Sequence, residues 1–299
     1  MKRIIKKYRI KETSLLEGGR SYDIKHLLID ETGKKYVLRE SPKALKHKKY
    51  AQYCYLEMFK TINANIAKVV EWGFLENDNI YMLFDFIEGE NALNVINTLN
   101  DEDAYKMGYE AGKTLKDIHD VNVIHPTINW LELYEKKIDE TIKNYENSKI
   151  KLDKGQLVLD FYKNNLCLVS KRNITYVHGD YHAGNMIVYN KNIGIIDFDK
   201  TTIADPYSDF RQCCWNAIEN EYFATGIIDG YFKNDVPYDF FEILKFYTAE
   251  TLLAHLSWAY DKGEQEVYNA YAIFEKNMEW YDNFTLTIPT WYKKTKNFK

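Results

Sequence analysis

The sequence of residues 177–197, V-H-G-D-Y-H-A-G-N-M-I-V-Y-N-K-N-I-G-I-I-D, constrains the fold more than any other stretch of the chain. Residues 186–189 are typical of a strand, residues 190–192 of a turn, and residues 194–198 of a second strand. The pattern therefore predicts a polar loop that is followed directly by a tight hairpin. The loop is thereby brought next to the end of the returning strand.

Three oxygen-bearing side chains fall at defined points of this pattern: Asp180 on the loop, Asn185 at its exit, and Asp197 at the end of the second strand. Metal ions that neutralise nucleotide phosphates prefer hard oxygen ligands, and phosphoryl transfer also needs a group that accepts the hydroxyl proton. We therefore predict that Asp180 is the catalytic base and that Asn185 and Asp197 bind Mg²⁺. The alternative is an ordinary turn, which Asp and Asn also favour. The strand and loop context favours the catalytic interpretation.

These residues resemble the motif of the aminoglycoside phosphotransferase family, whose members are relatives of the protein kinases. The resemblance is carried by His178-Gly179-Asp180, His182, Asn185, Ile196-Asp197-Phe198, Asp205-Pro206 and Asp209. It implies an α+β, two-lobed protein-kinase-like fold with a small antiparallel β lobe and a larger, mainly helical lobe. Residues 1–88 would form the N-terminal nucleotide-binding lobe and residues 89–299 the C-terminal catalytic and substrate-binding lobe. The implied reaction is nucleotide-dependent O-phosphorylation of a small molecule, with ATP or GTP and Mg²⁺ as cofactors.

In the N-terminal region, residues 24–29 and 35–39 are typical of antiparallel strands. A glycine turn precedes them, and its backbone amides could cover nucleotide phosphates. The candidate residues of this turn are Gly18, Gly19 and Ser21. An ordinary hairpin turn is about as probable from the sequence, because the G-x-G-x-x-G pattern is absent.

Arg39 closes the strand Y-V-L-R-E, at the position where the kinase pattern more often has a phosphate-binding lysine. A helix is expected over residues 43–61, and its spacing places Tyr50, Tyr53, Cys54 and Glu57 on one stripe. An unpaired carboxylate on the core-facing side would be costly. We therefore predict an ion pair between Arg39 and Glu57, the alternative being a strand-end arginine and a surface glutamate.

The strand expected over residues 80–84 ends at Asp85-Phe86-Ile87, where polar and glycine residues interrupt the apolar run. By resemblance, Asp85, Phe86 and Ile87 form the hinge whose backbone receives the nucleotide base. His178 is expected to orient neighbouring groups by packing. Asp209 is expected to accept backbone hydrogen bonds and so to brace the loop.

The substrate is indicated only by charge. Residues 201–290 contain 15 acids and 5 bases, a net charge of −10. Such a field would attract a polycation, so an aminoglycoside is the favoured acceptor. Glu219, Glu221 and Glu250 are the predicted ammonium contacts, although most acids of this region are expected to solvate helix faces. A kinase of a metabolic alcohol such as choline, and a nucleotide-binding pseudokinase, are the alternatives.

The composition limits the compartment and the partners. The sequence shows neither an apolar run long enough for a membrane span nor a secretory signal, and its four cysteines lack C-x-x-C spacing. These features favour a cytoplasmic protein, either a monomer or a weak dimer. Residues 1–60 carry 16 basic and 7 acidic residues, but no aromatic platforms lie between them, so no nucleic-acid partner is expected.

Overall fold

The computed structural model describes residues 1–16, 23–123 and 129–293 of the 299-residue chain. Its N-terminal part contains a five-stranded antiparallel sheet in the order β1-β2-β3-β5-β4. The strands are β1 (Ile10–Leu15), β2 (Ile24–Asp30), β3 (Lys35–Ser41), β4 (Val69–Phe74) and β5 (Ile80–Asp85). The two strands expected over residues 24–29 and 35–39 are confirmed as β2 and β3.

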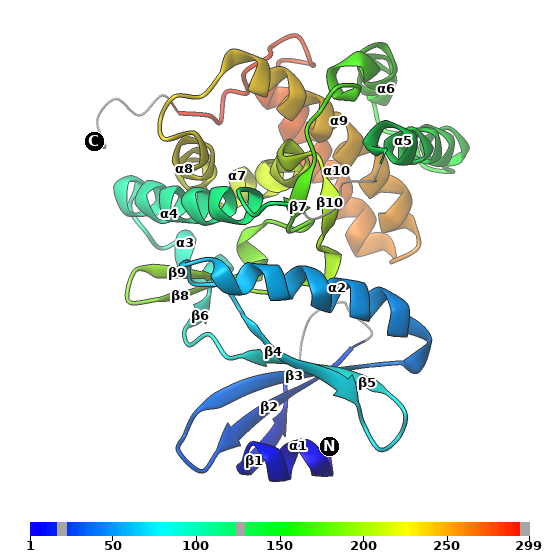
Figure 1. Ribbon diagram of the computed structural model, residues 1–299. Helices are drawn as coiled ribbons and strands as arrows, with labels where there is room; N and C mark the ends of the chain where they lie inside the picture. The colour runs from blue at the N-terminus through cyan, green and yellow to red at the C-terminus, as the bar shows by residue number, and fades with distance from the viewer. Residues whose placement is uncertain (17–22, 124–128, 294–299) are drawn as a thin grey trace.

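One helix covers each face of this sheet (Figure 1). Helix α1 (Lys2–Lys7) packs on the outer face through Ile4, against Tyr81 and Leu83 of β5 among others. Helix α2 (Lys46–Met58) lies between the sheet and the helical part of the chain, on the side to which Met82 and Phe84 belong. The alternation along β5 follows the two-residue period of a strand, and both faces are buried.

The expected helix over residues 43–61 is divided in the structure. A short 3₁₀ turn, η1 (Lys43–Leu45), precedes α2, and a second one, η2 (Phe59–Thr61), follows it. After β5 the chain enters the helical lobe through β6 (Glu90–Asn91) and α3 (Ala92–Ile96). The large lobe then contains α4 (Asp101–His119), α5 (Trp130–Asn147), α6 (Gly155–Asn164), η3 (Leu166–Val169), α7 (Cys213–Glu219), α8 (Glu221–Phe232), α9 (Tyr238–Tyr260) and α10 (Glu264–Trp280).

Helices α4 and α8 form the closest helix pair of the large lobe. A Cβ on Gly108 would lie 2.1 Å from the carbonyl oxygen of Phe223, and a Cβ on Gly226 would lie 2.2 Å from that of Tyr105. Because these positions are glycines, the two backbones touch and α4 runs deep through the core. The buried Tyr181 donates its hydroxyl to the carbonyl of Ala111, so α4 also supports the polar loop.

The predicted loop and hairpin lie at the junction of the two lobes (Figure 1). Strand β7 (Thr175–Val177) pairs with β10 (Thr202–Ala204), and β8 (Met186–Tyr189) pairs with β9 (Asn192–Ile195). The turn between β8 and β9 uses left-handed residues, Asn190 and Lys191. Three 3₁₀ segments complete the region: η4 (Ala183–Asn185), η5 (Phe198–Lys200) and η6 (Pro206–Gln212).

Among the described helices, none combines the length and the apolar character that crossing a membrane requires.

Candidate active site

The polar loop, residues 178–185, is held in place by the buried carboxylate of Asp209. The backbone N–H of His178 donates to its Oδ2 at 2.7 Å, and that of Gly179 donates to its Oδ1 at 2.6 Å. His119 Nε2, at the end of α4, lies 3.0 Å from Oδ2. Gly179 has a φ of 81°, and a Cβ there would lie 2.4 Å from the carbonyl oxygen of Lys200. The backbone contacts that we expected of Asp209 are therefore present.

His178 is buried and connects the loop to the segment that follows β9. Burial lowers the pKa of the His178 imidazole, so the ring is neutral near pH 7. Its Nε2–H then donates to the carbonyl of Ile196 at 3.0 Å, while its Nδ1 accepts from the backbone N–H of Asp180 at 3.2 Å. The ring packs against Tyr181 and Phe198. These contacts support the orienting role that we predict for His178.

The Asp180 carboxylate has four polar neighbours. Lys200 Nζ lies 3.0 Å and Gln212 Nε2 lies 3.5 Å from its Oδ1. Asn185 Nδ2 lies 3.3 Å and His182 Nε2 lies 3.8 Å from its Oδ2. Burial by itself would raise the pKa of Asp180, but His182 and Lys200 outweigh it and hold that pKa well below its ordinary value. The side chain is therefore a carboxylate at neutral pH, able to accept a proton.

Backbone hydrogen bonds bring Asn185 and Asp197 to the loop. Asn185 Nδ2 donates to the carbonyl of Asp180 at 2.9 Å, and the carbonyl of Asn185 accepts from the N–H of Ile196 at 3.0 Å. Strand β9 ends at Ile195, and Asp197 has a left-handed φ of 62°. Our prediction that Asp197 ends the strand is therefore wrong by two residues, because this left-handed residue turns the chain out of the hairpin.

The side chains of Asn185 and Asp197 offer oxygens, which are the donor atoms that a magnesium ion prefers. The amide nitrogen of Asn185 faces Asp180, so its oxygen is directed away from that carboxylate. The charge of Asp197 is balanced by Arg39 at 2.7 Å and Lys25 at 3.7 Å. Magnesium is commonly held by one or two protein ligands and completes its shell with water and phosphate oxygens. One oxygen from each of these two side chains would therefore be sufficient for such a site.

Arg39 is buried among three carboxylates in the structure. Its guanidinium lies 2.7 Å from Asp197 Oδ1 and 3.1 Å from Asp23 Oδ2, and it also pairs with Asp199. Asp197 and Asp199 follow β9, and Asp23 directly precedes β2, so the acids come from two regions far apart in the sequence. Arg39 thus joins the small lobe to the segment that carries the predicted metal ligand.

The predicted ion pair between Arg39 and Glu57 is wrong. Glu57 is paired instead with Lys60 at 2.5 Å, and its side chain is 36% exposed. The stripe that we predicted on this helix is not its core face, since Tyr50 and Cys54 are exposed. The buried residues of α2 are Lys49, Gln52 and Leu56. A shift of one residue turns a helix by about 100°, which is enough to move Glu57 off the core face.

The predicted hinge follows β5. The N–H of Asp85 donates to the carbonyl of Lys68 at 3.0 Å, and that of Phe86 donates to the carbonyl of Lys35 at 3.3 Å. Phe86 and Ile87 also line a cavity of about 700 Å³ between the hinge, α4 and the β8–β9 hairpin. Two of the three hinge amides are therefore engaged within the small lobe. The predicted phosphate-covering residues lie outside the described residues: Gly18, Gly19 and Ser21.

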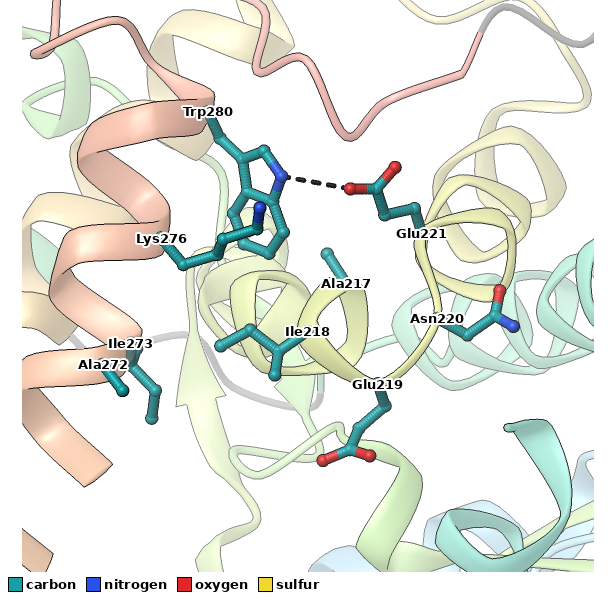
Figure 2. A pocket seen from close by; sticks show the side chains of 9 residues that line it. All are labelled: Ala217, Ile218, Glu219, Asn220, Glu221, Ala272, Ile273, Lys276 and Trp280. Carbon is teal, nitrogen blue, oxygen red and sulfur yellow. Dashed lines mark hydrogen bonds between the residues drawn. The ribbon is translucent and has the colours of Figure 1, made fainter. Parts of the chain in front are cut away.

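Two of the predicted acceptor residues line a second cavity, of about 410 Å³ (Figure 2). Figure 2 shows Glu219 on α7 and Glu221 at the start of α8, with Trp280 of α10 across from them. Glu221 accepts from Trp280 Nε1 at 3.1 Å and pairs with Lys293 at 2.6 Å. Glu219 accepts from Asn97 at 2.9 Å. The remaining lining residues are Ala217, Ile218, Asn220, Ala272, Ile273 and Lys276.

Helix α7 connects this cavity to the polar loop. In its first half and at its centre, the ring of Trp215 lies 6.0 Å from that of His182, and Asn216 Oδ1 accepts from the backbone N–H of Ala183 at 2.9 Å. Its last turn lines the cavity. Because Asn216 and Glu219 are three residues apart, the rise along α7 between the loop contact and the cavity is about 5 Å.

Glu250 does not face a substrate, so its predicted role as an ammonium contact is wrong. Its side chain is 3% exposed. Tyr134, Tyr162 and Lys137 donate to its carboxylate, and Arg211 lies 3.7 Å away. Burial by itself would raise the pKa of Glu250, but Lys137 and Arg211 lower it. The acid therefore belongs to a buried polar cluster in the core of the large lobe.

Several polar residues at this junction were missed by the sequence analysis. They are Asp23, Lys49, Asp199, Lys200 and Gln212. Asp199 had a usable signal, since it is the second acid of I-D-F-D and lies two residues after a predicted metal ligand. The two lysines had none, because an isolated lysine is normally a solvated side chain.

Residues 12–241, well over half of the chain, match the sequence model of the phosphotransferase enzyme family. The chain belongs to this family. No curated protein is a significant match to the chain. The phosphotransferase does, however, resemble many solved structures.

Three of these structures indicate the extent of the likeness. The GDP complex of wild-type aminoglycoside 2′-phosphotransferase-IIIa has a TM-score of 0.70 at 15% identity, covering 91% of this chain and 95% of that one. Amicoumacin kinase hAmiN in complex with AMP-PNP, Ca²⁺ and Ami has a TM-score of 0.66 at 14% identity, covering 96% of this chain and 95% of that one. The gentamicin–APH(2″)-IIa complex has a TM-score of 0.64 at 18% identity, covering 92% of this chain and 94% of that one. At these identities the likeness establishes the fold, which is the expected two-lobed, protein-kinase-like one.

Proposed function

We propose that this phosphotransferase moves the γ-phosphoryl group of ATP or GTP to a hydroxyl group of a small molecule. The observation that carries the proposal is the junction of Asp180, Asn185 and Asp197. Asp180 and Asn185 are in direct contact, and a backbone hydrogen bond joins Asn185 to the residue before Asp197. One proton acceptor and two oxygen ligands are thereby held together, as phosphoryl transfer requires.

In the proposed reaction, Asp180 accepts the proton of the acceptor hydroxyl. The hydroxyl oxygen forms a bond to the γ-phosphorus while the bond to the β–γ bridging oxygen breaks, and a nucleoside diphosphate leaves. Asn185 and Asp197 would hold a Mg²⁺ ion, which neutralises phosphate charge when it is bound. Lys200 is paired with Asp180 Oδ1 in the structure. Its own side chain is 64% exposed, so it can move into solvent when the acceptor hydroxyl binds Asp180.

Nucleotide binding is assigned to residues 1–88 and catalysis with acceptor binding to residues 89–299. Arg39 is the proposed phosphate ligand of the small lobe. Two of the similar structures contain GDP or AMP-PNP, which supports a nucleoside triphosphate as the phosphoryl donor. The protein would act in the cytoplasm as a monomer or weak dimer.

An aminoglycoside is the acceptor that we favour. Glu219 and Glu221 line a cavity beside the last turn of α7, whose central Asn216 contacts the polar loop, so an acceptor with several rings could contact both places. A cavity of about 410 Å³ is within the usual range for small-molecule sites. One similar structure contains gentamicin, which supports the same class. Phosphorylation of such an antibiotic would give resistance.

A smaller, singly charged or neutral alcohol, of which choline is an example, is the second candidate. It is favoured by the burial of Glu250 and by the pairing of Glu221 with Lys293, because both carboxylates are thereby engaged by the protein's own cations. A pseudokinase is disfavoured, because the three polar residues of the active site are all present on the loop and hairpin.

The test is a phosphate-transfer screen of the wild-type protein with ATP and GTP, against aminoglycosides, macrolides, choline and amino sugars. The inactive control is Asp180→Asn. We expect transfer to at least one aminoglycoside. Transfer only to a neutral or singly charged alcohol would exclude the aminoglycoside and retain the kinase. Absence of both nucleotide binding and transfer would exclude the proposed reaction.

A further inference from the structure

The core face of α2 is polar at the point where it meets the large lobe. Lys49 is 5% exposed and Gln52 is 4% exposed. Lys49 Nζ lies 3.0 Å from Asp199 Oδ1, and Gln52 donates both to that carboxylate, at 3.3 Å, and to the carbonyl of Phe198. Helix α2 is therefore attached to the segment that follows the predicted metal ligand, through a lysine and an amide.

Lys49 also lies 2.6 Å from Asp23 Oδ2, in the small lobe. Asp23 is itself 3% exposed at its side chain and accepts from Ser41 at 2.6 Å. Both acids that contact Lys49, Asp23 and Asp199, contact Arg39 as well. The lysine and the arginine thus share the same two carboxylates.

Among the described residues that contact one another here, the charges of the cluster are balanced. Asp23, Asp197 and Asp199 contribute three negative charges, and Lys25, Arg39 and Lys49 contribute three positive charges. Without Lys49 the cluster would carry one net negative charge, and Arg39 would be the only cation in contact with Asp23 and Asp199 among the described residues. Both changes would oppose an anionic nucleotide.

We infer that Lys49 is a positioning residue for the nucleotide: by sharing Asp23 and Asp199 with Arg39, it offsets the negative charge around the arginine and so favours phosphate binding beside it. The kinase arrangement uses a carboxylate on this helix, whereas here the helix supplies the cation and the carboxylates come from the residue before β2 and the segment after β9. Glu57, the acid that does lie on α2, is paired outside the cluster with Lys60. The inference rests on the proposed nucleotide binding.

The experiment measures Mg²⁺–ATP and Mg²⁺–GTP affinity by calorimetry, so it requires no identified acceptor. We expect Lys49→Met to weaken binding about 10-fold, because it removes a charge close to the phosphate-binding arginine. Lys49→Arg keeps the positive charge and should retain most of the wild-type affinity. Glu57→Gln is the matched control on the same helix and should stay within 2-fold of the wild type. Equal affinity of Lys49→Met and wild type would overturn the inference.

A double variant separates charge balance from packing. Asp23→Asn in the Lys49→Met background restores neutrality and should bring the affinity back to within about 3-fold of the wild type. If Lys49 served only to pack α2, the second substitution would give no recovery, and that result would also overturn the inference. If Lys49→Met alone does not fold, the double variant is compared directly with the wild type. Both have a balanced cluster, so affinities within about 3-fold of each other are expected, and a 10-fold loss in the double variant would contradict the charge argument.

Failure of the proposed function gives a different result. In that case the wild-type protein itself binds neither nucleotide. If the wild type binds a nucleotide and Lys49 has no influence on the affinity, only the role of Lys49 is removed.

Discussion

Asp180 and Glu250 are both carboxylates beside a lysine, but the structure leaves only one of them open to a ligand. The Asp180 side chain is 19% exposed, and its partner Lys200 is 64% exposed. The Glu250 side chain is 3% exposed and is enclosed by Lys137, Arg211 and two tyrosines. A carboxylate takes part in chemistry only where a substrate can reach it. The first acid is therefore suited to proton transfer, and the second to the stability of the large lobe.

The largest expected effect is on the accessible acid. Asp180→Asn keeps the size of the side chain but removes its ability to accept a proton. We expect kcat to fall about 10²-fold or more, while Mg²⁺–nucleotide binding persists. Steady-state kinetics and calorimetry measure the two quantities. Turnover near the wild-type level would show that Asp180 is not the base.

A second variant separates the metal ligand from the base. Asp197→Ala should abolish Mg²⁺-dependent nucleotide binding, since the phosphate charge loses its bridging ion. The control is Asp78→Ala, which changes an exposed acid of the small lobe and should leave affinity unchanged. An unchanged Mg²⁺–nucleotide affinity in Asp197→Ala, measured by calorimetry, would remove Asp197 from the metal site.

Glu250→Gln examines the enclosed acid. Removing one charge of a buried ion cluster leaves Lys137 and Arg211 uncompensated, and we expect the free energy of unfolding to fall by about 3 kcal/mol. The KM for the acceptor should stay within 2-fold. Glu242→Gln changes an exposed acid on the same helix and should alter stability by less than about 0.5 kcal/mol. A large KM change at full stability would place Glu250 at the acceptor instead.

Stability should also depend on pH through these enclosed acids. Burial opposes ionisation of Asp209 and Glu250, yet His119 and Lys137 lower the pKa of the respective carboxyl below its ordinary value. A lowered pKa in the fold stabilises the protein above the unfolded pKa of about 4, and this stabilisation is lost as the pH falls through the folded value. Denaturant unfolding measures the free energy of unfolding. The contribution of these two acids to it should therefore be constant above about pH 5 and should decrease steadily below pH 4. The decrease should be smaller in Glu250→Gln, and an equal decrease would contradict the assignment.

The smallest expected effect concerns the acids at the acceptor cavity. Glu221→Gln should raise the KM of an aminoglycoside about 3-fold, because Glu221 already shares its charge with Lys293. In the wild type, KM should rise as salt increases to about 0.3 M, where the screening length is about 6 Å. Glu242→Gln has the same net charge as Glu221→Gln and should leave KM unchanged. Equal changes of KM in Glu221→Gln and Glu242→Gln would indicate that the overall negative charge of the lobe attracts the substrate, without a specific contact from Glu221.

The contrast between the two acids also marks how far sequence reasoning reached. Asp180, Asn185 and Asp197 lie within 18 residues, so a loop and one hairpin suffice to bring them together. Turn residues and strand periodicity encode such local geometry directly. The position of Asp197 was nevertheless misjudged by two residues, since a left-handed residue after β9 has no clear signature at an aspartate.

Contacts between distant segments were not predictable in the same way. Helix α2 contains both Lys49 and Glu57, and the sequence alone favoured the acid as the partner of Arg39. Which of them is buried depends on the rotation of α2 against Asp23 and Asp199, and these lie 26 and 150 residues from Lys49. Glu250 shows the same limit, because its tyrosine and lysine partners come from α5 and α6, more than 80 residues away.

The sequence by itself determined the chemistry of the loop and hairpin, the antiparallel strands of the small lobe and the helical character of the rest. These features depend on residue types and spacings within one or two turns or strands. The tertiary structure alone decided which charged residues are open and which are enclosed. The physical reason is that the cost of burying a charge is offset by partners from other parts of the chain, and a linear pattern does not contain their positions.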